Sequence, residues 1–187
     1  MRLILSKLNT KSLLLKHIRL ILLFCVFVTF SLPVSAQIEW LSWEEAVARN
    51  AKEPKKILVD LYTDWCGWCK KMDKTVFTDS VIQAYVKENF YAVKFDAEQK
   101  ETLVYDGHTF KFNPSSGRRG SHELAYALLD GRMTYPSIVY LDESRNRISI
   151  SPGFKPADKF ITELNFIQGG HYRTKTYQEF KSSLGKE

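Results

Sequence analysis

Residues 57–72 read ILVDLYTDWCGWCKKM and place an apolar strand directly before a helix. The first six residues are rich in β-formers and have almost no polar alternation, as expected of a strand that is covered on both faces. After the turn, Gly67 is the only residue that disfavours a helix. The two cysteines, Cys66 and Cys69, therefore stand at a strand-to-helix junction, where exposed backbone N–H groups and the helix dipole stabilise a thiolate.

The spacing of these cysteines suits a two-step disulfide exchange. Cys69 lies three residues beyond Cys66 on the same face of the expected helix. It can therefore attack a mixed disulfide formed at Cys66 and release the substrate. Two cysteines are also half of a zinc site, which needs two further ligands. The histidines after the cysteines do not have the spacing of metal ligands: His108, His122 and His171. The pattern therefore favours redox chemistry, and no metal is expected.

Helical and β-rich segments alternate along the chain, which indicates an α/β fold. The pairs Ser42–Glu45 and Thr176–Glu179 are capping boxes, and Ser121 is a third candidate cap. Asp106-Gly107 between β-rich arms predicts a hairpin. The expected helices are 43–50, 80–89, 121–129, 157–167 and one from 177, with Tyr177, Phe180 and Leu184 on its apolar side; in the second, Val81, Ile82, Tyr85 and Val86 share one face. The expected strands are 57–62, 91–95, 137–141 and 148–150.

The N-terminal segment 1–36 has the anatomy of a secretory signal peptide. Five basic residues precede an apolar run from Leu20 to Leu32, and Val34-Ser35-Ala36 approximates a cleavage site. We expect cleavage after Ala36 and one domain over 37–187. The alternative is an uncleaved anchor, but the apolar run is shorter than the roughly 20 residues of a spanning helix.

Charge and motifs exclude several function classes. Five of the 27 basic residues lie in 1–36, which leaves 22 basic against 21 acidic residues. The sequence pI of about 9.1 is therefore no evidence for nucleic-acid binding. Neither a dinucleotide fingerprint nor a flavin motif is present, so no organic cofactor is expected, and electrons must come from another protein.

The segment Val59–Lys70 resembles the active-site segment of the thioredoxin superfamily, and Tyr135-Pro136 precedes a strand where that family has a cis-proline loop. The resemblance covers roughly Ile57–Phe154 and is nearest to the C-terminal domains of the membrane disulfide reductase DsbD and their soluble relatives. It implies a thioredoxin fold with a central mixed sheet flanked by helices, and here a hairpin-bearing insertion at about 97–120. It also implies that Pro136 is cis and that the Tyr135 backbone pairs with the substrate chain.

The resemblance also implies the site roles. Cys66 is the attacking thiolate and Cys69 the resolving thiol, whose proton is accepted by Asp60, a buried carboxylate with a raised pKa. The alternative for Asp60 is a strand-end position facing solvent. Trp65 and Trp68 stand on either side of Cys66-Gly67. They are expected to form an apolar rim for unfolded or peptide substrates. Core packing is the alternative, and it suits Trp65 better. Asp64 is expected to be a solvated turn residue.

The two residues between the cysteines bear on whether the protein reduces or oxidises its substrates. Gly67-Trp68 replaces the Gly-Pro of thioredoxin, and no histidine stands there as in strongly oxidising relatives. A reducing or isomerising role is therefore favoured over that of an oxidant. The expected partners are exported proteins with disulfides and a membrane electron donor of the DsbD type, in a bacterial periplasm, with secretion or an endoplasmic reticulum left open.

Two further hypotheses stay open. One is a reductase dedicated to a single client, and the other is a thioredoxin-fold binding or chaperone-like module with a structural disulfide. Arg118-Arg119 lies between glycines in the insertion and is expected to be a solvated loop, with contact to a partner as the alternative.

Overall fold

The computed structural model describes residues 16, 17, 19 and 37–185. The chain divides into two units, 1–35 and 36–187, and every element below belongs to the second. The predicted signal peptide falls almost wholly outside the described residues and stays a prediction. None of the described helices is long and apolar enough to cross a membrane.

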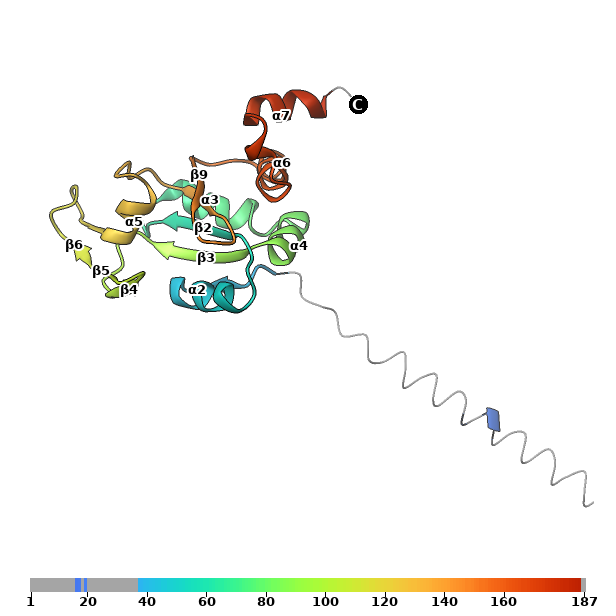
Figure 1. Cartoon of the computed structure of the whole chain (residues 1–187), viewed down its shortest axis with the longest axis horizontal. Helices are drawn as coiled ribbons and strands as arrows, with labels where there is room; N and C mark the ends of the chain where they lie inside the picture. Colours follow the sequence, from blue (N-terminus) through green and yellow to red (C-terminus); the bar gives the residue numbers. More distant parts are fainter. Residues whose placement is uncertain (1–15, 18, 20–36, 186–187) are drawn as a thin grey trace, which may run out of the picture. The chain divides into compact units, whose positions relative to one another are not determined.

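A five-stranded mixed sheet forms the centre of the second unit (Figure 1). Its order is β1 (Trp40–Leu41), β3 (Tyr91–Asp96), β2 (Ile57–Tyr62), β8 (Ser137–Leu141) and β9 (Arg147–Pro152). The first three strands are parallel, whereas β8 and β9 are antiparallel to their neighbours. The predicted central mixed sheet is confirmed, and β2 lies in the middle of it.

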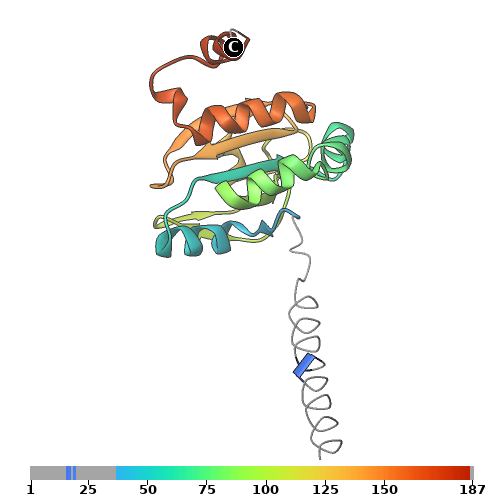
Figure 2. The ribbon, with the colours of Figure 1, turned by 90° about the vertical axis from the view of Figure 1, so that its right-hand side faces the viewer.

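Helices cover both faces of the sheet, which gives three layers (Figure 2). One face packs against α3 (Gly67–Thr75), α4 (Ser80–Asn89) and α6 (Ala157–Gln168). The other packs against α2 (Trp43–Lys52) and α5 (Glu123–Leu128). The chain ends with a short 3-10 helix, η1 (His171–Arg173), and α7 (Tyr177–Leu184).

The apolar run of β2 follows from this layering. Ile57, Val59 and Leu61 belong to the core on the α2 and α5 side. Leu58 belongs to the core beneath α3, α4 and α6. Because successive side chains of a strand alternate between faces, Asp60 lies on the same face as Leu58. The strand therefore places one carboxylate beneath α3.

Several local predictions are confirmed and some are wrong. The capping boxes at Ser42 and Thr176 are present. Ser121 does not cap α5, because it pairs in β7 (Ser121–His122) and leaves the cap to the next residue, whose ring accepts the Leu124 N–H. The expected apolar stripes are narrower, because Val81 of α4 and Leu184 of α7 are exposed.

The predicted hairpin is present in the segment between β3 and α5. Strands β4 (Leu103–Tyr105) and β5 (His108–Phe110) pair across Asp106 and Gly107, both of which have positive φ. A second ribbon joins β6 (Phe112–Asn113) to β7. The buried His122 fastens this segment to the sheet, since its backbone N–H donates to the Ala97 carbonyl at 2.7 Å.

Candidate active site

Three loops meet at one end of the sheet. Leu61 near the end of β2 pairs with Ser137 at the start of β8, so the Cys66 loop lies beside the loop that ends at Pro136. Tyr62 pairs with Asp96, so the insertion leaves the sheet at the same end. The Tyr135–Pro136 peptide bond is cis. The sheet register thus brings together cysteines and proline that are distant in sequence.

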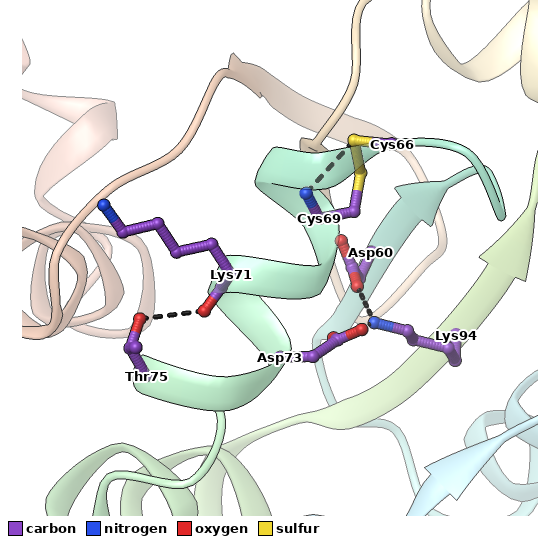
Figure 3. Close-up of polar contacts among 7 residues, drawn as sticks. All are labelled: Asp60, Cys66, Cys69, Lys71, Asp73, Thr75 and Lys94. Atoms are coloured by element: carbon purple, nitrogen blue, oxygen red, sulfur yellow. Dashed lines mark hydrogen bonds and ion pairs between the residues drawn. A yellow bond between two sulfur atoms is a disulfide. The ribbon is translucent and has the colours of Figure 1, made fainter.

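Cys66 is the N-cap of α3, and its Sγ accepts a hydrogen bond from the Cys69 backbone N–H at 3.1 Å. The two cysteines form a disulfide (Figure 3). Only 5% of Cys66 and 2% of Cys69 is exposed. In the reduced protein the same N–H and the helix dipole would stabilise a Cys66 thiolate.

Asp60 lies below the disulfide, with its carboxylate between Cys69 and Lys94 (Figure 3). It is 1% exposed, so the solvent-facing alternative is wrong. Its Oδ2 accepts a hydrogen bond from Lys94 Nζ at 2.5 Å, and Asp73 of α3 pairs with the same ammonium group. Oδ1 of Asp60 is buried without a hydrogen-bond partner among the described residues. One carboxylate oxygen is therefore available to a proton.

Burial raises the pKa of Asp60 from 3.8 to about 6, although the charge and hydrogen bond of Lys94 oppose this shift. The predicted raised pKa is thus confirmed. Burial alone would lower the pKa of Lys94, but the charges and hydrogen bonds of Asp60 and Asp73 raise it overall. The ammonium group consequently stays charged beside the carboxylate at neutral pH.

The two tryptophans flank the cysteines at the surface. Trp65 is 52% exposed and Trp68 56% exposed, so the core-packing alternative for Trp65 is wrong. The Trp65 ring meets Tyr135 edge-on, with the ring centroids 6.1 Å apart. Trp68 packs on Phe154 at 5.4 Å. Gly67, the first residue of α3, is exposed between them. Asp64, which precedes Trp65, is exposed as well, as predicted for a solvated residue.

The sequence patterns did not indicate Lys94, Asp73 or Glu98 as residues of this region, and they indicated Arg119 only as a loop residue that could contact a partner. Lys94 and Asp73 form an ion-pair cluster with the buried Asp60. Glu98 and Arg119 both contact Trp65, the first by accepting the indole N–H at 2.9 Å. The one available signal was Lys94 itself, a charged residue inside an otherwise β-rich strand. Its partner depends on the register of β2 and β3, which the sequence does not display.

No group of three cysteine, histidine or acidic side chains that could hold a metal ion occurs in the part of the chain that the structure describes. The arrangement around Cys66 instead combines a helix-capping sulfur, a second cysteine and a buried carboxyl group with one vacant oxygen. These groups can exchange a disulfide with another pair of thiols and transfer one proton.

Known proteins provide an independent comparison. Residues 39–142 match a protein-family model described as thioredoxin-like. The chain is 28% identical over 119 residues to the thiol:disulfide interchange protein DsbD of Actinobacillus pleuropneumoniae serotype 5b (strain L20), which covers 62% of this chain and 17% of DsbD. It is 26% identical over 124 residues to the disulfide bond reductase DsbH of Chlamydia pneumoniae, covering 65% of this chain and 66% of DsbH.

The fold agrees with solved structures. A thioredoxin from Thermus thermophilus superposes with a TM-score of 0.52 at 16% identity, covering 70% of this chain and 87% of that one. At this identity the likeness concerns the fold alone. The family match spans more than half of the sequence and includes β2, both cysteines and Pro136. The chain therefore belongs to the thioredoxin-like family.

Proposed function

We propose that the protein is an exported thiol:disulfide oxidoreductase that exchanges disulfides with protein substrates through Cys66 and Cys69. The observation that carries the proposal is the position of Cys66 at the N-cap of α3, where its sulfur already accepts the Cys69 N–H. A sulfur in this position is stabilised as a thiolate, which is the nucleophile of disulfide exchange. DsbD and DsbH are named for this chemistry, which supports the proposal.

The proposed reaction has two balanced steps. The Cys66 thiolate attacks one sulfur of the substrate disulfide, forms a mixed disulfide and releases the other substrate sulfur as a thiolate, which takes up a proton. Cys69 then loses its proton and attacks the Cys66 sulfur. This second step closes the Cys66–Cys69 disulfide and releases the second substrate thiol. The substrate gains two electrons, and the protein loses two.

Asp60 is proposed to accept the proton of Cys69 in the second step. Its Oδ1 is buried without a hydrogen-bond partner among the described residues, and its carboxylate lies beneath Cys69 (Figure 3). With a pKa of about 6 it is ionised at neutral pH and yet basic enough to take a proton transiently. Because Lys94 holds the other oxygen, the vacant one is directed away from that ion pair.

The proposed direction is reduction or isomerisation. No histidine stands between the cysteines to favour the reduced form, and DsbH is named a disulfide bond reductase. A membrane donor of the DsbD type would return electrons to the pair. The leader-like pattern of residues 1–36 supports export, with a bacterial periplasm as the proposed location.

A second candidate is a binding module with a locked disulfide. The low exposure of both cysteines, 5% and 2%, is the observation that favours it. A structural disulfide would show the same burial, and would leave Asp60 without a chemical role.

Trapping distinguishes these two candidates. A Cys69→Ser variant keeps the attacking thiol and lacks the resolving one, so an exchanging enzyme accumulates mixed disulfides with exported proteins. A Cys66→Ser variant is the matched control and should trap almost nothing, because Cys69 is 2% exposed. Equal and negligible trapping by both variants would contradict the proposed exchange and support the binding module.

A further inference from the structure

A pocket of about 350 Å³ lies between the insertion and the cis-proline loop. Trp65 and Tyr135 form part of its wall, and these residues immediately precede Cys66 and Pro136. A substrate chain that reacts at Cys66 and passes the cis-proline would therefore run beside this pocket. The pocket is therefore placed to contact a residue next to the substrate cysteine.

The charge of the pocket is supplied by Arg118, Arg119 and Glu98. Glu98 uses one oxygen to accept the Trp65 indole N–H, whereas neither arginine has a carboxylate within ion-pair distance among the described residues. The lining thus carries two positive charges and one negative charge. An unpaired guanidinium is a planar fork that matches a carboxylate.

Arg119 makes a cation–π contact with Trp65, with its guanidinium carbon 5.4 Å from the ring centroid. This contact uses no N–H group of the guanidinium as a hydrogen-bond donor to a carboxylate, so those groups can serve a ligand. Arg118, beside it on the pocket wall, is exposed. Both arginines are thus exposed, as expected of a solvated loop, but Arg119 also contacts Trp65, the residue before Cys66.

The loop that carries the arginines is fixed in place. The Ser116 N–H donates to the Asn113 carbonyl at 3.3 Å, and the Ser121 and Ser116 hydroxyls are 2.6 Å apart. Gly120 has a φ of 76° and approaches Phe112 so closely that a Cβ there would meet the ring. A ligand would therefore order the arginine side chains and little of the loop backbone.

We infer that this pocket, which we call the arginine pocket, binds the carboxylate of an acidic residue adjacent to the reactive cysteine of the client protein. The inference rests on the proposed function and names the class of client: polypeptides with Asp or Glu beside the disulfide. Arg118 and Arg119 are specificity residues in this account, and the redox chemistry stays with the cysteines.

Peptide reduction tests the inference. Cyclic disulfide peptides of one sequence are made with Glu, Gln or Lys at each of the two positions on either side of the reactive cysteine. For at least one position, the reduced protein should reduce the Glu peptide roughly tenfold faster than the Lys peptide, and this ratio should fall with added salt. In an Arg118→Gln/Arg119→Gln variant the ratio should fall to one or below, because Glu98 then leaves the lining with a net negative charge.

A charge-matched control is Lys52→Gln/Lys159→Gln, which removes two exposed cations on α2 and α6 outside the pocket lining. This control should keep the Glu-to-Lys ratio. Equal rates for Glu and Lys peptides in the unaltered protein, or a ratio that survives the Arg118→Gln/Arg119→Gln changes, would overturn the inference.

Binding of unreactive peptides separates this inference from the proposed function. With Ser in place of Cys, the Glu peptide should shift the Trp65 indole N–H resonance, and the double arginine variant should abolish the shift. A protein that reduces none of the peptides but shows this shift has the arginine pocket without the proposed activity. A protein that reduces the peptides without the shift or the rate ratio has the activity without the pocket.

Discussion

The pKa of Asp60 connects the stability of the protein to its chemistry. A carboxyl group with a higher pKa in the folded than in the unfolded state binds protons more tightly when folded. Its ionisation therefore destabilises the folded protein, and the loss accumulates as pH rises from 3.8 to about 6. At neutral pH the loss amounts to about 3 kcal/mol, because each tenfold difference in proton affinity between the two states corresponds to about 1.4 kcal/mol.

Asp60→Asn should therefore stabilise the protein by about 2 to 3 kcal/mol at pH 7.5 and leave its stability nearly unchanged below pH 4. Denaturant unfolding at a series of pH values measures this. The same variant should slow release of the mixed disulfide about a hundredfold at neutral pH, because Cys69 loses its proton acceptor. A variant that is less stable at pH 7.5 and releases substrate at the original rate would contradict both roles.

Lys94 sets how far the pKa of Asp60 rises. Its charge and hydrogen bond lower that pKa, whereas Asp73 raises it. Lys94→Met should consequently move the pKa of Asp60 clearly above 6, since the burial remains and the opposing charge is gone. A carboxyl NMR titration of Asp60 reports the value directly. The control is Lys159→Met on the surface of α6, and equal titration curves for both variants would exclude the proposed electrostatic role of Lys94.

At the scale of elements, the sequence predicts long segments well and short ones poorly. The capping boxes locate α2 and α7, and the apolar run locates β2, because these signals are local. The two-residue strand β1 pairs with the distant β3, and β6 and β7 pair with each other across the loop that carries the arginines, so two residues alone give no pattern that indicates them. For this reason the sequence wrongly predicts a helix cap at Ser121.

The site shows the same division. The motif locates Cys66 and Cys69, and the family resemblance locates cis Pro136. The contact of Arg119 with Trp65 is not predictable from the sequence, because it depends on how the insertion folds back over the end of the sheet. The sequence therefore predicts the reactive residues of the site but not the contacts around them.

Gly120 tests the rigidity of the insertion. A Cβ at this residue would lie 2.3 Å from the Phe112 ring, whereas Gly117 in the same loop has a similar positive φ and open space around it. Gly120→Ala should thus destabilise the protein by about 1 to 3 kcal/mol more than Gly117→Ala. Thermal or denaturant unfolding of both variants gives the comparison. Equal losses would show that the close approach to Phe112 does not constrain the loop.

At the scale of the whole molecule, the sheet order creates the site. Because β2 lies between β3 and β8, its end carries the Cys66 loop, with the insertion on one side and the cis-proline loop on the other. The α3 layer covers Asp60 and gives that carboxyl its raised pKa. The insertion adds the arginine pocket to this arrangement. The proposed redox chemistry and the proposed client choice therefore lie in different segments of one fold.

The reduction potential of the Cys66–Cys69 pair tests the central claim most directly. The protein would be equilibrated with defined ratios of reduced and oxidised dithiothreitol and glutathione, and the fraction of reduced pair measured by thiol alkylation. We predict reversible exchange with a potential near the roughly −270 mV of thioredoxin, or between that and the roughly −180 mV of protein disulfide isomerase. A pair that never equilibrates would contradict it, and a value near the roughly −120 mV of DsbA would contradict the proposed direction.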